Sequence, residues 1–167
     1  MKKNILLSLL VFVALTLSAQ ERRELHILRI NDPHAAMEQF PRLGFVADSL
    51  RTLYPELLIL SAGDNRSGDP INDMFELPAY PVVALMNQIG FHATVIGNHE
   101  YDSNQDGLAR LINLSAFSTL CANMEPDPKW KMHVKPYQVF DCGGISVGVI
   151  GITALGSMGI PESHPNR

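Results

Sequence analysis

The 167-residue chain has a formal charge of −4, and 46% of its residues are hydrophobic. These values exclude an intrinsically disordered chain, because the apolar content is ordinary and the charge is modest. The slightly acidic balance also argues against a partner that is a nucleic-acid polymer, since binding its backbone needs clustered Lys and Arg side chains.

The first residues have the pattern of a secretory signal peptide. Two lysines follow the initial Met, residues 5–17 form an apolar run without charge, and small residues precede Gln20. We therefore expect residues 1–19 to be removed on export, which leaves residues 20–167 as a periplasmic or extracellular chain without a stable membrane span. An uncleaved membrane anchor is the alternative, although a spanning helix needs about 20 apolar residues.

Hydrophobic spacing and turn residues predict alternating strands and helices in the rest of the chain. In chain order we expect a strand at residues 25–30, a helix at 41–53, a strand at 57–60, a helix at 80–89, a strand at 93–96, a helix at 108–114, a strand region from Leu120, and a hairpin of strands 137–140 and 145–152. This order is typical of an α/β fold with a mostly parallel sheet covered by helices. No internal repeat interrupts it, so we expect one domain.

The chain has two cysteines, Cys121 and Cys142. Cys121 lies in a short apolar stretch that is typical of a buried strand, and Cys142 precedes a Gly-Gly turn. We expect two unpaired thiols. A disulfide is the alternative, since an exported protein can form one.

Three polar motifs follow three of the predicted strands. They are Asn31-Asp32-Pro33-His34, Gly63-Asp64-Asn65 and Gly97-Asn98-His99-Glu100-Tyr101-Asp102. The carboxyl ends of parallel strands meet at one edge of an open α/β sheet, and ligands bind there. We therefore expect the polar side chains of all three motifs to converge at this edge.

The residue types in these motifs suit a hydrolytic site with two metal ions. Carboxylates, imidazoles and an amide oxygen are suitable ligands for Zn, Mn, Co or Fe. Asp32 and His34 are two positions apart, which puts both side chains on one face of an extended segment, so they can share one ion. Asp64 is the expected bridge between ions about 4 Å apart, because it is central and the preceding Gly63 permits close approach of the backbone.

In this order, the motifs resemble those of the calcineurin-like metallophosphoesterase superfamily. The third motif is similar to the Gly-Asn-His-Glu-Phe-Asp signature of secreted 5′-nucleotidases and 2′,3′-cyclic nucleotide phosphodiesterases, and the likeness extends from Leu25 to about Thr153. The resemblance implies a four-layer αββα sandwich, of which this chain carries the N-terminal part as a mostly parallel sheet ending in the hairpin. It also implies hydrolysis of a nucleotide, or of another small phosphoester, by a hydroxide that two divalent metal ions activate.

The resemblance implies a set of metal ligands. Asp32 and His34 match ligands of the first metal ion. Asp64 matches the carboxylate that bridges the two ions, and Asn98 matches a ligand of the second ion.

The resemblance also implies residues that act on the substrate. His99 matches the catalytic histidine, and Asp102 matches the carboxylate that orients it, which requires a helical turn at this point. Arg66 is a candidate contact to a phosphate oxygen through its planar guanidinium, with a solvated loop residue as the alternative. We expect Glu100 to support the site from outside the metal shell or to begin a helix, with a role as a metal ligand as the alternative.

Two features of the family are missing from this sequence. Members complete the two-metal site with histidines from later Gly-His and Gly-His-x-His segments, and a C-terminal domain holds the base of the substrate; this sequence has neither. We therefore expect the phosphoesterase domain at residues 20–167 to be incomplete at its C-terminus. The alternatives are a truncated, inactive fragment that binds metal or phosphate, and a cyclic-nucleotide phosphodiesterase.

Overall fold

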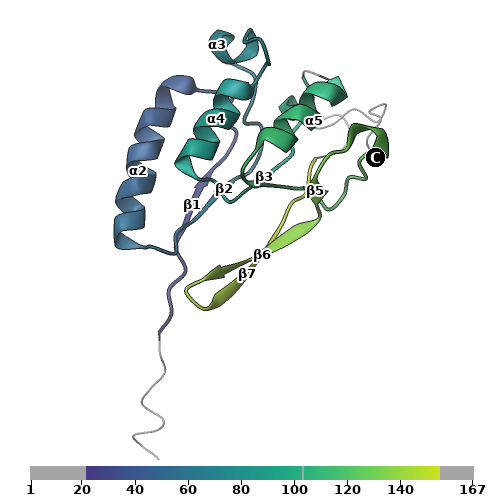
Figure 1. Cartoon of the computed structure of the whole chain (residues 1–167). Coiled ribbons are helices and arrows are strands. Elements are labelled where there is room, and N and C mark those ends of the chain that lie inside the picture. Colours follow the sequence, from purple (N-terminus) through teal and green to yellow (C-terminus); the bar gives the residue numbers. More distant parts are fainter. Residues whose placement is uncertain (1–21, 103, 155–167) are drawn as a thin grey trace, which may run out of the picture.

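The computed structural model describes residues 22–102 and 104–154, so the predicted signal peptide lies outside the described residues. A parallel sheet of five strands forms the centre of this part (Figure 1). Its strands are adjacent in chain order, namely β1 (Ile27–Ile30), β2 (Leu58–Ser61), β3 (Ala93–Val95), β4 (Ser118–Leu120) and β5 (Val134–Lys135).

Three helices lie side by side across one face of this sheet (Figure 1). They are α2 (Phe40–Leu53), α4 (Tyr80–Ile89) and α5 (Asn104–Leu114). Shorter helical segments are η1 (Met37–Gln39), α3 (Pro70–Asp73), η2 (His99–Tyr101) and η3 (Pro128–Trp130). Within the described ranges, no helix has the length and apolar character needed to cross a membrane.

The hairpin forms a separate antiparallel sheet after the parallel one. It consists of β6 (Tyr137–Cys142) and β7 (Ile145–Ile150), and β6 contacts β4. The turn between them is Gly143-Gly144, and both glycines have positive φ, a conformation that glycine adopts without strain.

The main core lies between the parallel sheet and the helices. Ile59 of β2 is fully buried, and it belongs to the same cluster as Val82 and Met86 of α4 and Leu111 of α5. Burial of one such side chain contributes about 1.5–3 kcal/mol. This layer fixes the strands, and therefore fixes the points from which the loops at the carboxyl edge begin.

The α/β class, the parallel sheet and the hairpin are confirmed. The predicted boundaries of α4 agree with the structure, and the predicted start of α2 differs by one residue. The expectation of unpaired thiols is also confirmed, because Cys121 and Cys142 are both buried and free. Burial raises the pKa of each thiol, which keeps it in its neutral form.

Several predicted boundaries were wrong. Strand β1 begins at Ile27 rather than Leu25, β6 ends at Cys142, and β7 ends at Ile150. Helix α5 begins at Asn104 rather than Leu108, because its first turn is polar and is capped by the Asn104 side chain, which accepts hydrogen bonds from the N–H groups of Asp106 and Gly107. Strand β4 ends at Leu120 rather than beginning there. Its first residues are polar, so an apolar run does not reveal them.

Candidate metal centre

The loops that follow β1, β2 and β3 meet at the carboxyl edge of the sheet, as the sequence predicts. Backbone hydrogen bonds continue the pairing of β1 with β2 into the first two loops; they run from Asp32 N to Gly63 O at 3.3 Å, from His34 N to Asp64 O at 3.0 Å, and from Ala35 N to Asn65 O at 2.9 Å. The first two motifs are therefore held together by the backbone, independently of any bound ion.

The loops after β2 and β3 approach each other so closely that only glycine fits at two positions. A Cβ atom on Gly97 would lie 2.2 Å from Oδ1 of Asp64, and one on Gly63 would lie 2.9 Å from the carbonyl oxygen of Val95. Both distances are well below van der Waals contact. Gly63 also has a φ of +91°, which other residues rarely adopt.

Three of the predicted ligands form one group. Asp32, His34 and Asp64 each offer a donor atom, and these atoms lie within 4.8 Å of one another. Nε2 of His34 is 2.9 Å from Oδ1 of Asp32, so these two atoms face the same point. Ligands around a single transition-metal ion, with bonds of about 2.1 Å, have a similar spacing. Two carboxylates and an imidazole thus fit a divalent ion in both chemistry and position.

His34 is oriented by the backbone of the second loop. Its Nδ1 lies 2.9 Å from the carbonyl oxygen of Ser67. Because a carbonyl oxygen can only accept a hydrogen bond, Nδ1 carries the proton, and Nε2 of the neutral ring is the nitrogen available to a metal ion. Sequence reasoning did not identify Ser67. The sequence feature that indicates this contact is the following residue, Gly68. A Cβ atom there would lie 2.5 Å from the carbonyl oxygen of His34, so only glycine lets the two loops come this close.

The backbone around the ligands differs from the prediction. An extended segment was expected at Asp32 and His34, but these residues have φ values of +56° and +44°. Asp64 and Ser67 are also left-handed, with φ values of +50° and +66°. Residues other than glycine adopt this backbone conformation at a cost in conformational free energy, and residues of this kind concentrate at functional sites. The two ligands therefore converge through a tight turn rather than through strand periodicity.

His99 and Asp102 form the predicted pair beside this group. Nδ1 of His99 lies 2.9 Å from Oδ2 of Asp102, across the single turn of η2. The ring of His99 meets the ring of His34 edge to face, with centroids 4.6 Å apart. The His99 side chain is 36% exposed, so a substrate can reach it.

Charges around this pair shift both pKa values. The hydrogen bond to Asp102 raises the pKa of His99, and the negative charges of Asp102, Asp64 and Glu100 act in the same direction against partial burial. Burial pushes the pKa of Asp102 upward, but hydrogen bonds from the side chains of Ser67 and His99 outweigh it and hold the pKa below its ordinary value. The pair thus favours a protonated ring beside an ionised carboxylate.

The structure places the remaining predicted residues around this centre. Asn98 is exposed and lies between Gly97, which contacts the Asp64 carboxylate, and His99, whose ring contacts His34. Arg66 is only 4% exposed. Burial lowers the pKa of its guanidinium, although the negative charges of nearby carboxylates act to raise it. A contact between Arg66 and a phosphate stays a prediction, and the alternative, a solvated loop residue, is wrong because the side chain is buried.

Comparison with known proteins points to one family. A family model described as calcineurin-like phosphoesterase matches residues 25–160. The chain is 31% identical to the NAD 5′-nucleotidase of Haemophilus influenzae, covering 89% of this chain and 28% of that protein. It is 32% identical to a 5′-nucleotidase of Vibrio cholerae, covering 86% of this chain and 28% of that protein.

The fold supports the same relationship. The solved structure of the NAD nucleotidase of Haemophilus influenzae superposes with a TM-score of 0.72 at 27% identity, covering 84% of this chain and 28% of that structure. The chain therefore spans about a quarter of the length of these relatives.

The His99–Asp102 pair generates a prediction that NMR can check. Replacing Asp102 with Asn keeps the shape of the side chain but removes its charge and weakens the hydrogen bond to Nδ1, so the pKa of His99 should fall toward its ordinary value. A titration of the ring proton resonances in both proteins measures this shift, and His92 serves as an internal control. An unchanged pKa for His99 would show that Asp102 does not set its protonation.

Proposed function

Because the chain belongs to the calcineurin-like phosphoesterase family, we propose that it serves the hydrolysis of a phosphoester at a two-metal centre, with a nucleotide as the substrate. The observation that carries this proposal is the position of the Asp32, His34 and Asp64 donors beside the His99–Asp102 pair. The substrate class is supported by the names of the relatives, which are nucleotidases.

In this proposal, two divalent ions share the edge of the sheet. Asp32, His34 and Asp64 hold the first ion, and Asp64 and Asn98 contribute to the second, with Zn, Mn, Co or Fe as suitable metals. When bound, such ions neutralise charge on a phosphate and make a bound water more acidic. Asp64 is the proposed bridge between the two ions for two reasons. Its carboxylate contacts the Gly97-Asn98 segment, and one of its oxygens belongs to the group formed with Asp32 and His34.

His99 has the properties of a proton donor to the phosphoryl group. Nδ1 of His99 is hydrogen-bonded to Asp102, so Nε2 is the nitrogen of the His99 ring that can face the substrate. In the chain without metal, the hydrogen bond to Asp102 raises the pKa of His99, which favours the protonated ring. From this position the ring can donate a hydrogen bond to a phosphoryl oxygen or protonate the leaving group, while Asp102 stabilises its positive charge.

Replacement of Asp64 and of His99 separates metal binding from catalysis. In the intact protein, Asp64→Ala should remove both metal binding and hydrolysis, because both ions lose a shared ligand. His99→Ala should lower turnover by about 10²-fold or more with normal metal content, since His99 is not a ligand in this proposal. Metal analysis and phosphate release from a nucleotide panel measure both effects.

The same assay decides between the remaining alternatives. Release of product from 2′,3′-cyclic nucleotides but not from 5′-nucleotides would show that the activity is that of a phosphodiesterase rather than a nucleotidase. Absence of turnover from residues 20–167, with metal still bound, would support the inactive metal-binding fragment. Loss of metal in step with activity in His99→Ala would contradict the role given to that residue.

We also propose that the domain begins near Gln20, after removal of residues 1–19 on export. This proposal rests on the basic start and the apolar run of the first residues. N-terminal sequencing of the protein recovered from the cell envelope or the medium should give a chain that starts near Gln20. Recovery of a chain that retains Met1 would contradict both the cleavage and the exported location inferred from it.

A further inference from the structure

We propose that Glu100 is a positioning residue of the metal centre, because its carboxylate clamps the loop that carries Asp64 to the loop that carries Asn98. This inference rests on the proposed metal centre, and it adds a residue that binds neither metal nor substrate. Its role is to fix the spacing between ligands that come from two different strands.

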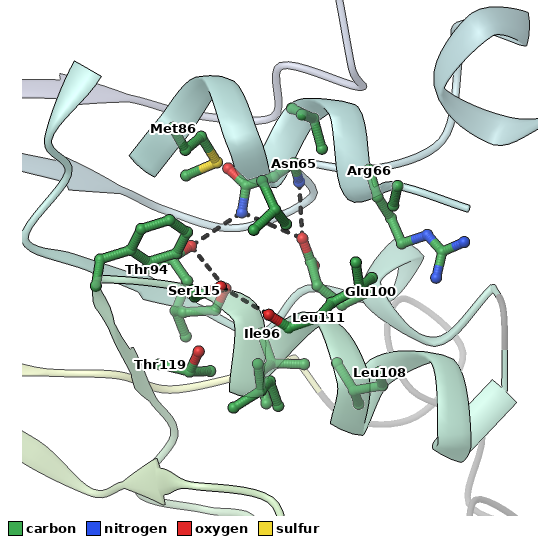
Figure 2. Close-up of a pocket in the computed structure, with 16 residues that line it drawn as sticks. Asn65, Arg66, Met86, Thr94, Ile96, Glu100, Leu108, Leu111, Ser115 and Thr119 are labelled. Atoms are coloured by element: carbon green, nitrogen blue, oxygen red, sulfur yellow. Dashed lines mark hydrogen bonds between the residues drawn. The ribbon is translucent and has the colours of Figure 1, made fainter. Parts of the chain in front are cut away.

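Both oxygens of the Glu100 carboxylate accept hydrogen bonds from the backbone of the loops, and Figure 2 shows those from Asn65. Oε2 accepts from the N–H of Asp64 at 3.0 Å and from the N–H of Gly97 at 2.7 Å. Oε1 accepts from the N–H of Asn65 at 2.8 Å and from its side-chain Nδ2 at 3.2 Å. A single side chain therefore joins the loop after β2 to the loop after β3.

The clamp is anchored in the sheet through Asn65. The Asn65 side chain is buried, and its Nδ2 also donates to Oγ1 of Thr94 in β3 at 2.9 Å (Figure 2). Its Oδ1 accepts from the hydroxyl of Ser61 in β2. These contacts connect Glu100 to two adjacent strands, so the carboxylate holds the loops relative to a rigid part of the fold.

The clamp acts on the metal ligand Asp64 in two ways. It binds the N–H of Asp64, whose backbone has a left-handed φ of +50° and needs support to keep it. It also holds Gly97 at the start of the turn that leads to His99, and the N–H of His99 donates to Oδ1 of Asp64 at 2.9 Å. Both the backbone and the carboxylate of Asp64 are thus fixed by contacts that depend on Glu100.

A carboxylate is required at this position. All four contacts of Glu100 are with N–H donors, and an ionised carboxylate offers only acceptors. A glutamine of the same shape would place an NH₂ group against two of these donors. The loops would then separate locally while the core remained intact, and the ligands would lose their fixed spacing.

The test compares Glu100→Gln, which turns a carboxylate into an amide, with a control variant. The control is Asn87→Asp, which turns an amide into a carboxylate. Asn87 in α4 also joins two segments through backbone groups, since Oδ1 accepts from Ala116 N at 2.7 Å and Nδ2 donates to Leu114 O at 3.0 Å. Two quantities are measured in the whole chain: amide hydrogen exchange at Asp64, Asn65 and Gly97 without metal, and the dissociation constant for Mn²⁺ alone.

In Glu100→Gln, exchange at these three amides should accelerate, and the dissociation constant for Mn²⁺ should rise by about 10-fold or more. Asn87→Asp should change neither. Glu100→Asp keeps the charge on a shorter side chain and should give a dissociation constant for Mn²⁺ between those of the unaltered chain and Glu100→Gln. If Glu100→Gln does not fold, Glu100→Asp alone provides the test.

Three results would overturn the proposal, and they can be told apart. Unchanged exchange at the three amides would show that Glu100 does not hold the loops. Faster exchange with an unchanged Mn²⁺ constant would show that the clamp does not position the ligands, and the metal centre itself would stand. Failure of the unaltered chain to bind Mn²⁺ would remove the metal centre and the positioning role together.

Discussion

The close approach of the loops after β2 and β3 is the constraint on which the site depends. Gly63 and Gly97 permit it, because a side chain at either position would collide with the opposite loop. The approach brings the Asp64 carboxylate against the segment that begins the third motif, and Glu100 satisfies the backbone N–H groups that meet there. The segments that carry Asp64 and Asn98 are distant in sequence, and they meet only because the backbones come this close.

The ligand loops combine unfavourable backbone conformations with compensating hydrogen bonds. Each left-handed residue other than glycine costs about 1–2 kcal/mol. The ligand loops contain five such residues, namely Asp32, His34, Ala35, Asp64 and Ser67. Backbone hydrogen bonds between the first two loops contribute about 1 kcal/mol each, and bonds to the Glu100 carboxylate contribute about 1.5–3 kcal/mol each. These hydrogen bonds offset the cost of the left-handed residues, and burial of the Glu100 carboxylate, which raises its pKa, opposes part of that gain. A preformed set of donor atoms would need little reorganisation to bind an ion.

The position of the three motifs could be predicted from the sequence, because it follows from the order of the strands and from residue chemistry. The three motifs were placed at strand ends, and Asp32, His34 and Asp64 do form one group. The tight turn around His34 could not be predicted, because a left-handed φ at a residue other than glycine has no signature in the pattern. Ser67 was missed for a related reason: it acts on His34 through its backbone carbonyl, which any residue possesses.

We propose that Asp32, His34 and Asp64 form a metal site on the carboxyl edge of the sheet, and a single measurement can test this. Crystals of the chain grown with Mn²⁺ or Zn²⁺, and measured at the absorption edge of the metal, locate the ion directly by anomalous scattering. We expect an anomalous peak within about 2–2.3 Å of Nε2 of His34 and of a carboxylate oxygen from each aspartate. A fully occupied ion elsewhere, with these three side chains turned away from one another, would contradict it.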